Sequence, residues 1–124
     1  MRNSSIGKRI CILEDNKDIR EIIELVLHEE NYQVFAFGNV RDFWNGALRL
    51  QPDAYLLDVM LPDGNGIEVC CELKKDKLTQ NTPVLMMSAN FSGEEKNVQC
   101  GAADYINKPF DIFDLAKRIS AQLA

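Results

Sequence analysis

The chain has very few of the side chains that bind transition metals. It contains one histidine, His28, and its four cysteines form no CxxC pair. A zinc site or a dithiol redox motif needs closely spaced cysteine or histidine ligands, so the sequence argues against both. We expect the cysteines to be reduced thiols that pack as small apolar side chains, which indicates a cytoplasmic protein. They are Cys11, Cys70, Cys71 and Cys100.

The sequence also lacks an excess of positive charge and a long apolar run. Its formal net charge is -5, which argues against direct binding to nucleic acid or to an anionic membrane surface. Its apolar runs are too short to span a bilayer. The opening stretch, MRNSSIGKR, has no apolar core of a secretory signal. We expect residues 1–7 to be a flexible lead-in and residues 8–123 to form one domain.

Short apolar runs alternate with stretches in which apolar residues recur at helical spacing. The runs predict five strands, at residues 9–13, 32–37, 54–57, 83–88 and 104–107. A helix is predicted after each strand. Asn39 is suited to cap the second helix and Asp111 the last, and the fourth helix falls within residues 91–100. Strands separated by helices run parallel, and continuous apolar strands are covered on both faces. The sequence therefore predicts an α/β, doubly wound sandwich of five strands and five helices.

Polar side chains stand where four of the predicted strands end. They form a strand-end set of Glu14, Asp15, Asp58, Ser88 and Lys108. The carboxyl ends of parallel strands lie along one edge of a sheet, where ligands bind. Clustered carboxylates favour a hard cation such as Mg²⁺, and an ammonium and a hydroxyl suit a phosphoryl group. Each residue alone could be a turn or capping residue, but the set as a whole indicates a functional site.

Four segments, in this order along the chain, resemble the receiver domains of two-component response regulators. They are ILEDN, LLDVMLPDGNG, PVLMMSA and GAADYINKPFD, and the resemblance extends from about Lys8 to Leu123. It implies a flavodoxin-like sheet with strand order 2-1-3-4-5. It also implies a signalling switch controlled by phosphorylation. Such a domain catalyses only its own phosphorylation and dephosphorylation and is not an enzyme in the usual sense.

The resemblance assigns roles to the strand-end residues. It implies that Asp58 accepts a phosphoryl group from a histidine kinase or a histidine phosphotransfer protein. Mg²⁺, which Mn²⁺ could replace, would be bound by Glu14, Asp15, Asp58 and the backbone carbonyl of Met60. Ser88 and Lys108 would contact the phosphoryl oxygens.

The resemblance also concerns residues near the last strand. Tyr105 matches the family's switch aromatic, although a strand aromatic without that role is an equally good interpretation. Asp104 and Arg118 resemble charged residues of the surface through which many activated regulators dimerise. Ala103, however, stands where an acidic residue is usual, so a phosphorylation-dependent dimer stays an open alternative. The sequence does not name the downstream target.

Two other functions are compatible with this fold class. A Mg²⁺-dependent phosphatase with an aspartyl nucleophile usually has a second acid two residues after it, where this chain has Met60. A flavin-binding module would need a hydroxyl-rich phosphate loop after the first strand, where this chain has Glu14 and Asp15. Turnover of p-nitrophenyl phosphate and flavin absorbance distinguish these alternatives. We also expect the Lys108–Pro109 peptide bond to be cis, because X–Pro bonds are where cis is tolerated.

Overall fold

A parallel sheet forms the centre of the protein. The computed structural model describes residues 7–89 and 100–123. The strand order is β2-β1-β3-β6-β7, which in chain order is the predicted 2-1-3-4-5. All four neighbouring pairs are parallel. The strands are β1 (Arg9–Leu13), β2 (Gln33–Phe37), β3 (Ala54–Asp58), β6 (Val84–Ser88) and β7 (Asp104–Asn107).

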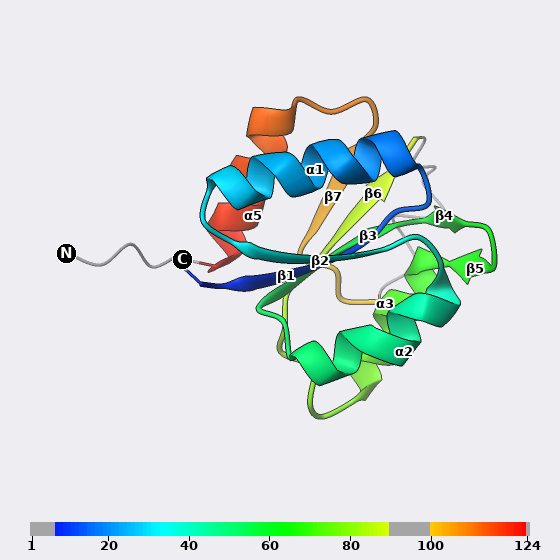
Figure 1. Cartoon of the computed structure of the whole chain (residues 1–124). Helices are drawn as coiled ribbons and strands as arrows, with labels where there is room; N and C mark the ends of the chain where they lie inside the picture. The colour runs from blue at the N-terminus through cyan, green and yellow to red at the C-terminus, as the bar shows by residue number, and fades with distance from the viewer. Residues whose placement is uncertain (1–6, 90–99, 124) are drawn as a thin grey trace.

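Helices cover both faces of this sheet, as the doubly wound prediction requires. Figure 1 shows α1 (Lys17–Glu29) and α5 (Ile112–Leu123) on one face. It shows α2 (Val40–Leu50) and α3 (Gly66–Lys75) on the opposite face. The described residues contain these four helices. The fifth predicted helix, within residues 91–100, falls almost wholly outside the described residues.

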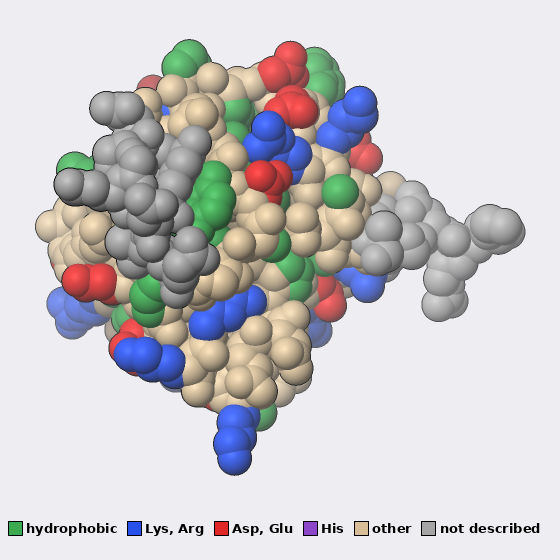
Figure 2. Space-filling model, turned by 180° about the vertical axis from the view of Figure 1, so that it is seen from behind, with side chains coloured by type: hydrophobic (Ala, Val, Ile, Leu, Met, Phe, Trp, Pro, Cys, Tyr) green, Lys and Arg blue, Asp and Glu red, His purple; other side chains and the backbone are tan. Residues whose placement is uncertain are grey.

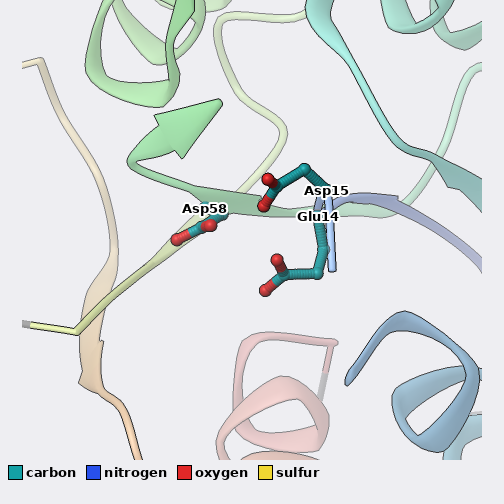
Figure 3. A group of neighbouring side chains, drawn as sticks. All are labelled: Glu14, Asp15 and Asp58. Atoms are coloured by element: carbon teal, nitrogen blue, oxygen red, sulfur yellow. The ribbon is translucent and has the colours of Figure 1, made fainter. Parts of the chain in front are cut away.

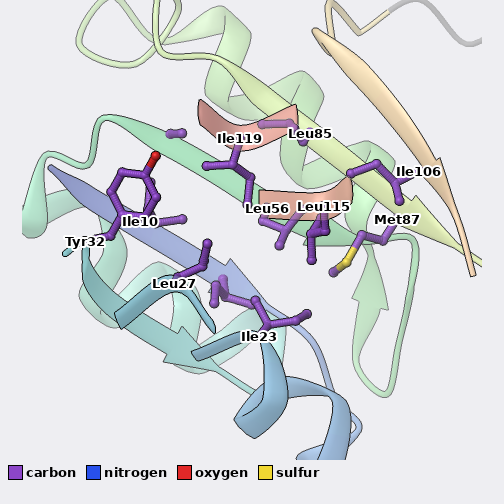
Figure 4. Packing of buried hydrophobic residues seen from close by; sticks show 12 residues of the cluster. Ile10, Ile23, Leu27, Tyr32, Leu56, Leu85, Met87, Ile106, Leu115 and Ile119 are labelled. Carbon is purple, nitrogen blue, oxygen red and sulfur yellow. The ribbon is translucent and has the colours of Figure 1, made fainter. Parts of the chain in front are cut away.

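Side chains of the strands alternate between two apolar clusters. Ile10 and Ile12 of β1 pack in the cluster beneath α1 and α5, whose buried residues are drawn in Figure 4. Cys11 and Leu13 of the same strand pack in the cluster beneath α2 and α3. All five residues of β3 are buried, which explains its continuous apolar sequence. The core therefore fixes β3, and with it Asp58, at the centre of the sheet.

Polar caps start the helices at the predicted places. The side chain of Asn39 accepts a hydrogen bond from the backbone N–H of Asp42 at 2.8 Å. The carboxylate of Asp111 accepts bonds from the N–H groups of Phe113 and Asp114 at the start of α5. Such caps satisfy N–H groups that have no partner inside the helix.

A small hairpin, which the sequence did not predict, follows β3. It pairs β4 (Met60–Leu61) with β5 (Gly64–Asn65) in antiparallel orientation. The Asp63 carboxylate at its tip accepts bonds from the N–H groups of Val40 and Arg41, at 2.8 and 3.0 Å. The hairpin is thereby joined to the start of α2, a contact that local sequence patterns do not reveal.

The expectation that all four cysteines are reduced is wrong for two of them. Cys71 and Cys100 form a disulfide, with their Cα atoms 4.7 Å apart. The residues are 29 positions apart in sequence, and they meet because the segment before β7 packs against α3. Cys11 and Cys70 are free and buried, as expected. The cysteines consequently give no support to a cytoplasmic location.

The surface carries charges of both signs. On the face shown in Figure 2, acidic and basic side chains are interspersed. Within residues 7–89 and 100–123, every helix is too short or too polar to be a membrane-spanning segment.

The buried hydroxyl of Tyr55 provides a test of the packing beneath α2 and α3. The Tyr55 ring lies 5.8 Å from that of Phe43, and its hydroxyl has no hydrogen-bond partner within the described part of the chain. An unpaired buried hydroxyl destabilises the fold by about 1 kcal/mol or more. Tyr55→Phe should therefore raise the melting temperature by roughly 3–6 °C.

Thermal unfolding followed by circular dichroism measures this shift. Tyr55→Ala serves as the matched control and should melt well below the wild type, because it removes the ring as well. A lower melting temperature for Tyr55→Phe would mean that the hydroxyl has a hydrogen-bond partner in solution.

Candidate functional site

Three carboxylates converge at the carboxyl edge of the sheet. Glu14 and Asp15 directly follow β1, and Asp58 is the last residue of β3. One oxygen from each of the three lies within 4.8 Å of the others. Figure 3 shows the three side chains facing a common space at the ends of these strands. Glu14 and Asp58 are buried, whereas Asp15 is exposed to solvent.

Strand pairing explains why these residues meet. Leu13 pairs with Leu57 in the β1–β3 ladder, so the next residue on each chain segment, Glu14 and Asp58, emerges side by side with the other. The turn after β1 then fixes Glu14. Its carboxylate accepts a bond from the N–H of Asn16 at 3.1 Å, and its carbonyl accepts one from Arg20 at 2.8 Å.

Lys108 connects two of the carboxylates. Its Nζ lies 2.5 Å from Oε1 of Glu14 and 3.3 Å from Oδ2 of Asp58. The Lys108 side chain is only 16% exposed, so solvent screens these ion pairs weakly. Its backbone N–H donates to the carbonyl of Ser88 at 2.8 Å, and the Lys108–Pro109 bond is cis, as predicted.

The site shifts the pKa of Asp58 and of Lys108 upward. Burial, and then the charge of Glu14, raise the pKa of Asp58 from 3.8 to about 6, although Lys108 opposes this. Burial alone would lower the pKa of Lys108, but its hydrogen bond to Glu14 and the charge of Asp58 raise it overall. At neutral pH, Asp58 is therefore ionised but poorly stabilised, next to a firmly protonated lysine.

The start of α3 packs so closely against the end of β3 that position 66 has room only for glycine. The N–H of Gly66 donates to the carbonyl of Val59 at 2.9 Å. A Cβ added to Gly66 would collide with the backbone carbonyl of Asp58. Gly66 was not predicted as a site residue. The proline and glycines of LPDGNG are typical of a turn, but the close approach of the start of α3 to the end of β3 is a tertiary contact.

The other predicted site residues lie on three different strands and differ in how far they are buried. Ser88 is buried at the end of β6, one residue beyond Met87, which pairs with Asp58. Met60 lies in β4 and is 70% exposed. Tyr105 is partly buried in β7, where it pairs with Met86.

The donor set fits a hard divalent cation. Three carboxylates in a small space repel one another, and Lys108 supplies a single positive charge against them. All three offer oxygen, which Mg²⁺ prefers over the softer ligands that zinc uses. Because Asp15 is exposed, the cluster is open to solvent on one side.

The chain is similar in sequence to known signalling proteins. A family model described as the response regulator receiver domain matches residues 10–120. The phosphate regulon transcriptional regulatory protein PhoB of Pseudomonas aeruginosa is 38% identical over 122 residues. These residues are 95% of this chain and 52% of that protein, so the chain spans about half the length of this relative.

Solved structures are similar as well. The non-phosphorylated HemR receiver domain from Leptospira biflexa superimposes with a TM-score of 0.87 at 26% identity, covering 95% of each chain. The receiver domain of the sensor histidine kinase PA1611 from Pseudomonas aeruginosa gives a TM-score of 0.84 at 28% identity. That match covers 94% of this chain and 98% of the other, whose structure has a magnesium ion coordinated in its active site cleft.

The raised pKa of Asp58 predicts how the metal-free protein responds to pH. The folded state holds the Asp58 proton more tightly than the unfolded chain, so this stabilisation is lost as the pH rises from about 4 to about 6. At pH 7 in EDTA, Asp58→Asn should therefore be more stable than the wild type by about 3 kcal/mol. This corresponds to a melting temperature roughly 9–18 °C higher.

Adding Mg²⁺ should reduce or reverse this difference. At about ten times its dissociation constant, Mg²⁺ should stabilise the wild type by about 1.4 kcal/mol and the Asn variant less. Asp18→Asn removes an equal charge from the exposed first turn of α1. It should melt at or slightly below the wild type in EDTA, because it leaves the acidic cluster intact, and it should gain as much stability from Mg²⁺ as the wild type does. The prediction is contradicted if Asp58→Asn melts lower than the wild type in EDTA and Mg²⁺ shifts neither protein.

Proposed function

This chain belongs to the response regulator receiver domain family, and on that basis we propose that Asp58 is its phosphorylation site. A phosphorylation-dependent signalling switch is the general function of such domains. One observation carries the assignment of Asp58. Its carboxylate stands at the end of the central strand, within the acidic cluster and 3.3 Å from Lys108.

The acidic cluster is suited to hold Mg²⁺. Glu14, Asp15 and Asp58 would bind the ion with the backbone carbonyl of Met60, and Mn²⁺ could take its place. Once bound, the ion supplies positive charge that offsets the negative charge of the reacting groups. The magnesium ion in the cleft of the PA1611 receiver domain supports this proposal.

The phosphoryl donor is a phosphohistidine of a histidine kinase or histidine phosphotransfer protein. An Asp58 carboxylate oxygen attacks the phosphorus, the phosphorus–nitrogen bond of the donor breaks, and the histidine imidazole leaves. The product is an acyl phosphate on Asp58. With its pKa raised to about 6, Asp58 is ionised at neutral pH and can act as the nucleophile.

Lys108 and Ser88 stabilise the transferred group. Lys108 is held beside Asp58 by its ion pair with Glu14, so its positive charge is in place before the reaction. Ser88 ends β6, the strand next to β3, and its hydroxyl would bond a phosphoryl oxygen. A change at Ser88 can pass along the sheet to Tyr105 in β7, the proposed switch aromatic, because Ser88 pairs with Asn107 of that strand.

The partner-binding surface that phosphorylation changes would include β7 and α5. Within the chain, Arg118 of α5 pairs with Asp104 at 3.3 Å and with Asp114 at 3.1 Å. A phosphorylation-dependent dimer through these residues would have to exchange these ion pairs for contacts between subunits.

Turnover of external phosphate esters is not part of the proposed function. Met60 occupies the position of the second acid of an aspartyl phosphatase, and its exposed thioether cannot protonate a leaving group.

Phosphorylation with acetyl phosphate and Mg²⁺ tests the assignment of Asp58. Borohydride reduction followed by peptide mapping should locate the label on Asp58 alone, and Asp58→Asn should carry none. The rate of labelling should fall at least roughly tenfold in Lys108→Ala, because one preorganised positive charge is gone. EDTA should abolish labelling of the wild type.

Asp63→Asn is the matched control for a nearby carboxylate. The Asp63 carboxylate bonds the N–H groups at the start of α2, so the variant should still be labelled on Asp58. Undiminished labelling of Asp58→Asn, or a label on Asp15, would refute the proposal.

A further inference from the structure

We propose that Cys71 and Cys100 form a reversible redox site, which a small-molecule disulfide such as oxidised glutathione closes and a dithiol opens. Neither cysteine belongs to the acidic cluster, and the chemistry of the pair does not depend on phosphorylation. The site joins α3 to the segment that enters β7, the last strand of the sheet.

The backbone brings the two cysteines within bonding range. Their Cα atoms are 4.7 Å apart, inside the interval of about 4.4–6.8 Å that disulfides occupy. The preceding cysteine of α3 holds the same segment, since the Cys70 thiol donates to the carbonyl of Cys100 at 3.7 Å. Gly101, with φ of +86°, then turns the chain next to the Lys74 side chain. The segment would therefore stay against α3 in the reduced protein, so the disulfide can form again.

Solvent can reach this pair. Cys71 and Cys100 are both partly exposed. Cys71 lines a surface pocket of about 360 Å³ between α2 and α3, together with Trp44, Glu68 and Lys75. A tripeptide disulfide or a dithiol has access to the Cys71 sulfur through this opening.

The other two cysteines are poor competitors for the exchange. Cys11 is fully buried, and burial raises its thiol pKa to about 12. Cys70 is 1% exposed, and burial raises its thiol pKa as well. Because the thiolate is the nucleophile, neither reacts readily at neutral pH. The fold thus leaves Cys71 and Cys100 as the reactive pair.

The Cys71–Cys100 bond forms by two successive thiol–disulfide exchanges. The thiolate of one cysteine attacks oxidised glutathione, forming a mixed disulfide and releasing one glutathione thiol. The thiolate of the other cysteine then attacks the protein sulfur of the mixed disulfide and releases the second glutathione. Two protein thiols are oxidised, two protons are released to solvent, and the small disulfide is reduced to two thiolates that take up protons.

Closing this bond constrains a defined part of the fold. The ring runs from Cys71 through β6 to Cys100, and it contains Ser88. β7 begins four residues after Cys100, and the N–H of Ala103 donates to the carbonyl of Val84 at 2.7 Å. The oxidised state therefore fastens the start of the segment that enters β7 to α3 through Cys100, whereas the reduced state holds Cys100 by noncovalent contacts alone.

Thiol counting tests the proposal on the intact chain. The reduced protein should titrate four thiols in denaturant, and equilibration with oxidised glutathione under native conditions should leave two. Peptide mapping should find the Cys71–Cys100 cross-link, and dithiothreitol should restore four thiols without unfolding. The oxidised form should melt about 5–15 °C higher than the reduced form. Hydrogen exchange should slow in peptides that cover residues 100–107.

Cysteine variants provide the controls. Cys71→Ser and Cys100→Ser should each lose the cross-link and the redox-dependent melting shift, whereas Cys70→Ser should keep both. The cross-link should also form in Asp58→Asn. A failure to form the cross-link can therefore be distinguished from a failure to phosphorylate Asp58. Stable glutathionylation without the cross-link, a cross-link through Cys70, or a bond that dithiothreitol opens only after unfolding would each overturn the proposal.

Discussion

The ion pairs of Lys108 with Glu14 and Asp58 are the interaction on which the site depends. Folding brings three carboxylates together, and their mutual repulsion opposes that arrangement. Lys108, at 2.5 Å from Glu14 and 3.3 Å from Asp58, offsets part of this repulsion. Burial, and then the charge of Glu14, still raise the pKa of Asp58 to about 6, so Lys108 does not fully compensate for either. The site is consequently suited to receive further positive charge, such as a divalent cation.

The sheet supplies the rigidity that such a site needs. β3 is buried along its whole length, and Asp58 is its last residue, so the proposed phosphorylation site is fixed by the core. Gly66 lets the start of α3 approach the Asp58 backbone, and the turn after β1 holds Glu14. Asp15, in contrast, is exposed at the open side of the cluster. The buried residues are therefore prearranged, while solvent and ligands enter beside Asp15.

The disulfide joins parts of the molecule that the acidic site also uses. Cys71 belongs to α3, the helix that begins at Gly66 beside Asp58. Cys100 precedes β7, and the end of β7 leads to Lys108. A covalent bond between these elements thus spans two of the segments that position the site. Under the two proposals, the redox state of the cysteines and phosphorylation of Asp58 both act on α3 and β7.

The sequence was enough to predict the five strands of the parallel sheet, the doubly wound class and the residues of the strand-end set, but not the β4–β5 hairpin. The predicted features follow from local periodicity and from the edge that parallel strands share. The sequence also indicated that Asn39 and Asp111 begin helices, because a cap is a local interaction. Tertiary structure alone decided that Lys108 lies closer to Glu14 than to Asp58, that Gly66 touches Asp58, and that Cys71 meets Cys100. Each of these contacts joins residues far apart in the chain or on separate elements. Their distances depend on how helices pack against the sheet, and no pattern of neighbouring residues specifies that packing.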